Sequence, residues 1–283
     1  MPNPREGACW AFIRGSFEFF VYGWYPDSEK WRVNLSFILL ILAIIGVLKE
    51  RLPGKTYLLW YAASFPFIAA WLLLGGLGLE PVETSKLGGI LLTIIIGVTG
   101  ISFSLPIGIV LALGRRSNMP ALKTVCVLFI EFIRGVPLIT LLFVASTMLT
   151  YFLPPGSTFD LLMRVLIMVT LFSSAYIAEV VRGGLQGLPS GQYEAADSLG
   201  LTYWKSHRLI ILPQALKISI PGIVNTFIGL FKDTTLVLII GMMDIVGLGR
   251  ARLNDPLWLG PVSYTHLRAH ETDSYLVCRL LLE

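Results

Sequence analysis

The sequence predicts an all-α, polytopic membrane protein, and three observations support this fold class. Of the 283 residues, 55% are hydrophobic and 14% are charged, and the mean hydropathy is +0.73. Soluble domains carry about 25% charged residues, so a chain this apolar is expected to have lipid as its solvent. The apolar residues form continuous runs instead of the period-2 alternation of a membrane β-strand. Basic residues are concentrated in alternate connections between these runs.

Several apolar runs are long enough to cross a hydrocarbon core of about 30 Å as helices, which takes roughly 20 residues. The connections between them are too short to hold a soluble domain. The six predicted membrane-spanning runs are residues 33–49, 57–79, 86–113, 121–153, 160–182 and 218–241.

The distribution of basic residues predicts the orientation, because cytoplasmic loops carry an excess of Lys and Arg. The connections after runs two and four, "GLEPVETSK" and "LPPGSTFD", hold a single lysine between them, so both are expected outside. Residues 1–32 would then also be outside despite four basic residues, which predicts an earlier span ahead of Met1 in the native chain. The basic connections, predicted to be cytoplasmic, contain Lys49, Arg51 and Lys55, then Arg115, Arg116 and Lys123, then Arg182, Lys205, Arg208 and Lys217.

Two of the runs are expected to be broken. The run 121–153 would form a helix of about 50 Å, too long for one crossing, and Pro removes a helix donor inside it. Charges at membrane depth usually face a cavity, a partner or an interface. The charged residues and helix breakers inside these two runs are therefore candidates for the translocation path or for helix breaks. The pairs Glu131–Arg134 and Lys232–Asp233 could equally be structural pairs near a membrane edge. The candidates are Glu131, Arg134, Gly135, Pro137, Lys232, Asp233 and Thr234.

A polar insert, residues 190–213, separates the last two runs. Ser190 is a favourable N-cap and Gly200 a favourable C′ residue, so residues 191–199 are predicted to form a short helix. A second helix is expected to start near Thr202 and run toward Pro213. A short, capped, protruding helix is suited to docking in a groove of another protein.

This insert resembles the EAA loop of ABC importer permeases, the coupling helix that binds the ATPase subunit. The resemblance implies a type I ABC importer transmembrane domain whose ATPase coupling depends on this segment. The matching positions are Glu194, Ala195, Ala196, Gly200, Ile210, Leu212 and Pro213.

Three further segments resemble the polar amino-acid permease branch: residues 131–139, 175–196 and 231–247, with Thr235 in place of the usual Ser. The upstream part is most similar to the general L-amino-acid transporter permeases. The implied organisation is an N-terminal extension with two extra spans (1–85) and a permease domain truncated before its last span (86–261). Residues 262–283 resemble translated sequencing-adapter read-through and are expected to be a non-native tail.

The resemblance implies a multi-pass permease subunit of the bacterial inner membrane that moves L-amino acids from periplasm to cytoplasm. Implied partners are two ATP-binding subunits, a second permease subunit and a periplasmic amino-acid-binding protein. No P-loop sequence is present, so the chain is expected not to be an enzyme, and ATP and Mg²⁺ belong on the partner ATPase. The alternatives are an ion-coupled secondary transporter using Glu131 or Lys232, and a non-transporting membrane scaffold.

Metal, disulfide and nucleic-acid functions are not expected. Cys9, Cys126 and Cys278 are odd in number and far apart. His266 and His270 have helical i, i+4 spacing but lack an evident third ligand. The net charge of +4 is accounted for by the basic loops, without a nucleic-acid partner.

Overall fold

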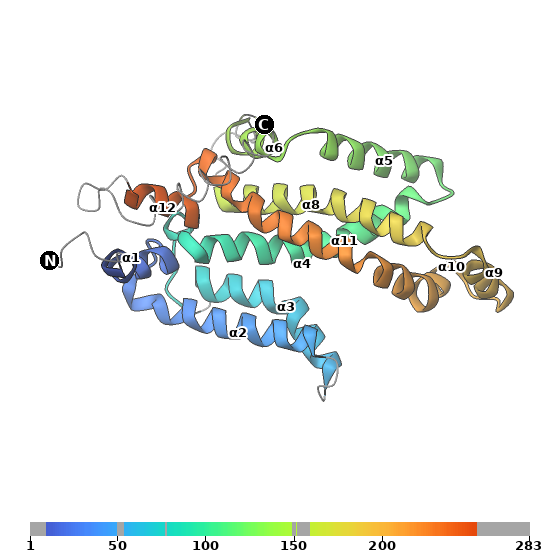
Figure 1. Cartoon of the computed structure of the whole chain (residues 1–283), viewed down its shortest axis with the longest axis horizontal. Coiled ribbons are helices and arrows are strands. Elements are labelled where there is room, and N and C mark those ends of the chain that lie inside the picture. The colour runs from blue at the N-terminus through green and yellow to red at the C-terminus, as the bar shows by residue number, and fades with distance from the viewer. Residues whose placement is uncertain (1–9, 50–53, 77, 149–150, 152–158, 254–283) are drawn as a thin grey trace, which may run out of the picture.

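The computed structural model describes residues 10–49, 54–76, 78–148, 151 and 159–253, and Figure 1 shows their arrangement. Within these ranges, helices and two isolated β-bridges are the regular elements. Five of the helical segments are long and apolar enough to span a membrane, and a sharply bent pair makes a sixth. The prediction of an all-α polytopic membrane protein is confirmed.

The chain passes from the α2–α3 hairpin through α4 to α5 and α6, and then returns to the centre of the bundle with α8 and α11. The α-helices are α1 (Trp10–Tyr22), α2 (Lys30–Leu48), α3 (Lys55–Leu74), α4 (Gly89–Arg115), α5 (Pro120–Gly135), α6 (Leu138–Phe143), α8 (Leu161–Gln186), α9 (Ser190–Ser198), α10 (Tyr203–Ser206), α11 (Leu212–Asp233) and α12 (Ile245–Leu253). Short 3-10 segments are η1 (Asp27–Glu29), η2 (Thr84–Lys86) and η5 (Thr234–Ile240), and π-helical turns are η3 (Val144–Met148) and η4 (His207–Ile211).

The centre of the bundle consists of α4, α8 and α11, which lie side by side in Figure 1. Small residues let their backbones approach closely, as is usual in membrane helix packing. A Cβ on Gly108 of α4 would lie 2.6 Å from the Ile177 side chain of α8. A Cβ on Gly184 of α8 would lie 2.5 Å from the Ala215 carbonyl oxygen of α11. Larger residues at either glycine would force these helices apart.

Two predicted runs have different bounds in the structure. The run 57–79 is helical only from Lys55 to Leu74, because Gly75 and Gly76 adopt φ of +81° and +99°, which ends the helix. The run 218–241 was predicted too short, since α10, η4, α11 and η5 form one helical segment from Tyr203 to Ile240. The residues near its start are polar, so a search for long apolar runs identifies only its later part.

The expected break in the run 121–153 is present. The helices α5 and α6 meet at a bend of 100°, which divides this run. Val136 is extended and Pro137 precedes α6, as expected for a residue that comes before proline. Gly135 is the last residue of α5, and nothing lies within 4 Å of a Cβ built there, so the break depends on the Val136–Pro137 pair. In the last run the chain stays helical, and α11 continues after Asp233 directly into the 3-10 helix η5.

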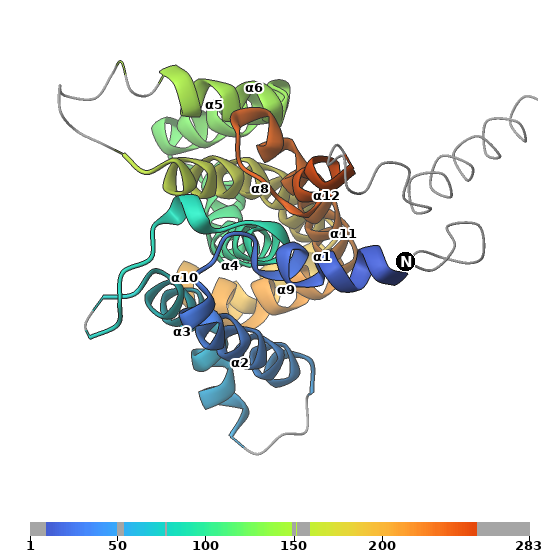
Figure 2. The same ribbon diagram turned by 90° about the vertical axis from the view of Figure 1, so that its left-hand side faces the viewer.

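The N-terminal segment contains a helix, α1, that span counting did not predict. It lies beside α12 at the end of the bundle opposite α9, as Figures 1 and 2 show. Two basic residues near it, Lys30 and Arg32, are paired with carboxylates. Arg32 is buried, pairs with Glu29 at 2.6 Å and donates to the Glu80 carbonyl oxygen at 2.7 Å. Arg32 is therefore a structural residue of this junction.

Candidate functional site

The EAA-like segment forms a short helix, α9, that projects from one end of the bundle (Figure 1). We call this end the α9 end. The helix starts at Ser190, with Pro189 in the N-cap position, and no side chain caps it. The expected N-cap role of Ser190 is wrong, because the fixed φ of Pro189 and its extended ψ already set the helix start. The Gln192 N–H bonds to the Pro189 carbonyl oxygen at 3.1 Å.

The other end of α9 is a Schellman motif centred on Gly200, as expected. Gly200 has φ +66°, a left-handed conformation that favours glycine. Its N–H bonds to the Asp197 carbonyl oxygen at 2.9 Å, and the Leu201 N–H bonds to the Ala196 carbonyl oxygen at 3.3 Å. These two bonds turn the chain sharply back into α10, so that α9 is a separate, rigid unit.

The matching positions differ in exposure. Glu194, Ala195 and Gly200 are exposed, whereas Ala196 is fully buried against the rest of the segment. Among the ion pairs of the described residues, none involves Glu194. The outer face of α9 therefore combines small residues with an unpaired carboxylate at the middle of the helix. Ile210 and Leu212 are half-buried and Pro213 is exposed, all at the junction of η4 and α11.

Tyr193, which sequence analysis did not single out, connects α9 to the membrane helices. Its hydroxyl accepts a hydrogen bond from Arg116 Nη1 at 3.0 Å and donates one to the Leu185 carbonyl oxygen at 3.1 Å. The Arg116 guanidinium also lies 5.4 Å from the centre of the Tyr193 ring. The connection between α4 and α5, the end of α8 and α9 are thereby linked by one side chain.

A second contact ties α9 to α11. Gln214 Nε2 donates to Gln192 Oε1 at 2.9 Å and to the Ile210 carbonyl oxygen at 3.0 Å. Next to it, the His207 ring stacks on Tyr203 with 4.0 Å between ring centres and also contacts the Tyr193 ring of α9. Hydrogen bonds and ring contacts therefore connect α9 to the ends of α4, α8 and α11.

Replacing Tyr193 by Phe should loosen α9 without removing the ring. The variant loses one hydrogen bond to a charged group and one to a carbonyl, and hydrogen bonds to charged groups contribute about 1.5–3 kcal/mol. We expect backbone amides of residues 190–198 to exchange with deuterium about tenfold faster. The control is Tyr57→Phe, because Tyr57 is highly exposed on α3. Equal exchange in wild type and Tyr193→Phe would contradict this role.

A charged cluster lies at the same end, between α4, α5 and α8. Glu179 of α8 is its centre and contacts the guanidinium groups of Arg115, Arg134 and Arg182. Arg115 Nη1 lies 3.3 Å from Glu179 Oε2 and 2.9 Å from Glu131 Oε1, and Arg134 Nη1 lies 3.6 Å from Glu179 Oε2. Three cations and two carboxylates thus join three helices.

The cluster changes the interpretation of one predicted pair. Glu131 pairs with Arg115 and Arg134 pairs with Glu179, so the ion pairs of these two residues join them to other helices and not to each other. Sequence analysis missed Glu179, Arg115 and Arg182 as members. Glu179 lies within an apolar run, three residues before Arg182 on the same helix, which is the signal that could have identified it.

The second group of candidates lies elsewhere. Lys232, Asp233 and Thr234 are near the far end of α11, about 30 Å along the helix from the α9 end. Lys232 is exposed, Asp233 half-buried and Thr234 buried, with the Thr234 hydroxyl donating to the Phe231 carbonyl oxygen at 2.8 Å. The ion pairs found in the described ranges do not include Lys232–Asp233.

No group of three or more His, Cys, Asp or Glu residues suited to a metal ion occurs within the described part of the chain. His266 and His270, with Cys9, Cys278 and the expected tail 262–283, lie outside the described residues. Cys126 is buried and free.

Comparison with known proteins gives three consistent findings. Residues 104–265 match the family of binding-protein-dependent transport system inner membrane components. The chain is 53% identical over 258 residues to the inner membrane amino-acid ABC transporter permease protein YhdY of Escherichia coli, covering 90% of this chain and 70% of that protein. It is 46% identical over 314 residues to the glutamate/glutamine/aspartate/asparagine transport system permease protein BztC of Rhodobacter capsulatus, covering 90% and 72%.

A solved structure is also similar. The crystal structure of an amino acid ABC transporter with histidines matches with a TM-score of 0.55 at 30% sequence identity. The match covers 69% of this chain and 89% of the other chain.

Proposed function

Because the chain belongs to the family of binding-protein-dependent transport system inner membrane components, we propose that it carries L-amino acids across the bacterial inner membrane as the permease subunit of an ATP-driven ABC importer. It is a multi-pass membrane protein. Permease subunits are not themselves enzymes; ATP hydrolysis is carried out by a separate ATPase. A permease of an ABC importer works in a complex with ATPase partners and a substrate-binding protein.

The finer assembly is a proposal. One copy of this chain and a second permease subunit would form the pathway, with two ATP-binding subunits on the cytoplasmic side and a periplasmic amino-acid-binding protein on the other. ATP and Mg²⁺ would be bound by the ATPase subunits. The α9 end would be cytoplasmic, because it carries the exposed EAA-like helix and the basic connections near Arg115, Arg116 and Arg182.

The observation that carries this proposal is the isolated position of α9. It is a short helix bounded by Pro189 and a Schellman motif, with an exposed face that contains Glu194 and Ala195. Its contacts through Tyr193 and Gln214 lead directly to α4, α8 and α11. When the ATPase pair closes on ATP, movement of α9 would rotate these helices between inward- and outward-facing states. In this mechanism, Glu194, Ala195, Ala196, Gly200, Ile210, Leu212 and Pro213 form the coupling segment.

The helix breaks would mark where the pathway changes shape. The bend at Val136–Pro137 interrupts helical hydrogen bonding within an apolar segment, where a cavity or neighbouring protein would satisfy the freed backbone groups, and the helix changes to 3-10 geometry after Asp233. We propose that Gly135, Pro137 and residues 232–234 lie at such sites. We propose further that 86–261 forms the transport domain and 1–85 an N-terminal extension carrying α2 and α3.

The proposal is tested with the chain purified together with its partner subunits and reconstituted in proteoliposomes. ATP-dependent uptake of L-amino acids is expected, with ATPase activity stimulated by the amino-acid-loaded binding protein. Uptake that persists without the ATPase would indicate a secondary transporter. Loss of both uptake and ATPase stimulation in an intact complex would indicate a scaffold.

A further inference from the structure

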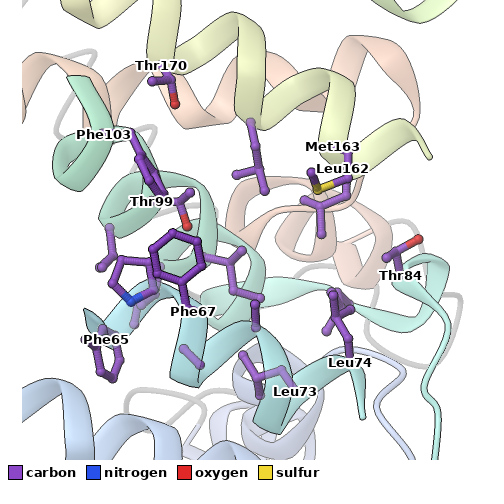
Figure 3. Close-up of a pocket in the computed structure, with 18 of the residues that line it drawn as sticks. Phe65, Phe67, Leu73, Leu74, Thr84, Thr99, Phe103, Leu162, Met163 and Thr170 are labelled. Carbon is purple, nitrogen blue, oxygen red and sulfur yellow. The ribbon is translucent and has the colours of Figure 1, made fainter. Parts of the chain in front are cut away.

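An apolar groove of about 660 Å³ separates the α2–α3 hairpin from α4 and α8, as Figure 3 shows. Its walls include Phe65 and Phe67 from α3, Phe103 from α4 and Leu162 from α8. The lining extends along α4 from Leu91 to Ile107, a length of about 24 Å at 1.5 Å per residue. The groove therefore runs along the membrane helices and extends past the middle of a ~30 Å hydrocarbon core.

The polar groups of the groove lie toward one end. Asp160 is the only charged residue among the described lining residues. Its carboxylate accepts a hydrogen bond from the Thr84 hydroxyl at 2.5 Å and one from the Met163 N–H at 3.1 Å. Ser36, in the second turn of α2, lines the groove, is 4% exposed, and its hydroxyl has no hydrogen-bond partner among the described residues. Buried hydroxyls usually have a hydrogen-bond partner, and an acceptor on a bound ligand would supply one here.

We propose that this groove binds a phospholipid with an ammonium head group, such as phosphatidylethanolamine. One acyl chain lies along α4 between α3 and α8, an ester carbonyl accepts from the Ser36 hydroxyl, and the ammonium group faces the Asp160 carboxylate. This site is separate from the proposed transport function, since it lies between the N-terminal hairpin and the bundle.

Polarity argues against a transported amino acid as the occupant. A transported amino acid carries two charges at its α-carbon, and transfer of such groups to an apolar lining with one carboxylate is costly. A flexible hydrocarbon chain carries no charge and is present in the surrounding bilayer.

The groove can be filled from α3. Ala70 lines it and is exposed to it, so Ala70→Trp should displace the acyl chain. Ala63 is exposed on the same helix but does not line the groove, so Ala63→Trp is the matched control. The full-length chain is purified from membranes containing phosphatidylethanolamine and phosphatidylglycerol, and retained lipids are measured by native mass spectrometry. Wild type and Ala63→Trp are expected to retain phosphatidylethanolamine, and Ala70→Trp to lose it.

Two conservative variants test the polar end. Ser36→Ala should retain less phosphatidylethanolamine while leaving the fold unchanged. Asp160→Asn keeps a side-chain cap for α8 but removes the charge, so the preference for phosphatidylethanolamine over phosphatidylglycerol should fall about tenfold. Equal lipid retention by Ala70→Trp and Ala63→Trp, or an unchanged preference in Asp160→Asn, would overturn the proposal. So would crosslinking of a cysteine at position 70 to a second permease subunit.

Discussion

Replacing Glu194 by Arg is expected to abolish amino-acid uptake and to prevent stable association of the ATPase, while membrane insertion is unaffected. Within this chain the change is mild, because Glu194 is exposed and none of the described ion pairs includes it. Glu194 lies at the middle of the nine-residue α9, beyond the first turn, so its charge adds little to the helix through the dipole. At an interface, a reversed charge that loses its partner costs about 2–5 kcal/mol, which weakens binding roughly 30-fold or more.

The matched control for this substitution is Glu83→Arg. Glu83 is an exposed carboxylate just before η2, far from α9, so the same charge change there should leave association intact. Binding is measured by titrating the purified ATPase onto the reconstituted permease, and uptake with labelled amino acids. Normal ATPase binding and normal uptake in Glu194→Arg would refute the assignment of α9 as the coupling helix.

Replacing Glu179 by Gln should destabilise the bundle far more than replacing Glu131 by Gln. Glu179 contacts three guanidinium groups on α4, α5 and α8, and its side chain is 23% exposed. Removing it leaves Arg134 and Arg182 without a carboxylate in contact among the described residues, and Arg115 with Glu131 alone. A fully buried pair broken on one side costs about 3–5 kcal/mol, and partial exposure reduces this to about 2 kcal/mol.

Glu131 provides the comparison within the same cluster. Its side chain is 54% exposed and pairs with Arg115 alone, so its loss should cost less than about 1 kcal/mol. Thermal unfolding of both variants in the same detergent gives the ranking, and size-exclusion profiles establish that both remain folded. A larger effect for Glu131→Gln, or equal effects, would show that Glu179 is not the centre of the cluster. Raised salt should reduce the difference in unfolding temperature between Glu179→Gln and Glu131→Gln, because the cluster is partly open to solvent.

The local turn chemistry was well predicted because it depends on residues close together in sequence. Gly200 ends α9 through bonds to carbonyls three and five residues earlier, and Pro137 restricts the residue immediately before it. Ser190 was wrongly predicted as the N-cap. Pro189 and Ser190 both suit the start of a helix, and in the structure Pro189 occupies the N-cap position. The predicted run 218–241 was shorter than the observed helical segment, Tyr203 to Ile240, because the first turns of that segment are polar.

The contacts of the charged residues could not be predicted from the sequence. Arg32 had the pattern of an orientation signal, yet it is buried between Glu29 and the Glu80 carbonyl oxygen, which lies 48 residues away. Glu179 meets Arg115 across 64 residues of sequence. Spacing along one helix predicts neighbours three or four residues apart, but it contains no information about which helix lies opposite.

The sequence by itself therefore determined the membrane fold class, the resemblance to ABC importer permeases, the short helix ending at Gly200 and the break at Pro137. Continuous apolar runs and backbone restrictions act locally, so they can be recognised without a structure. Only the tertiary structure decided the Glu179 cluster, the Tyr193 connection and the groove beside Ser36. Each of these depends on side chains from different helices meeting within a few ångströms, and that meeting is set by how the helices pack.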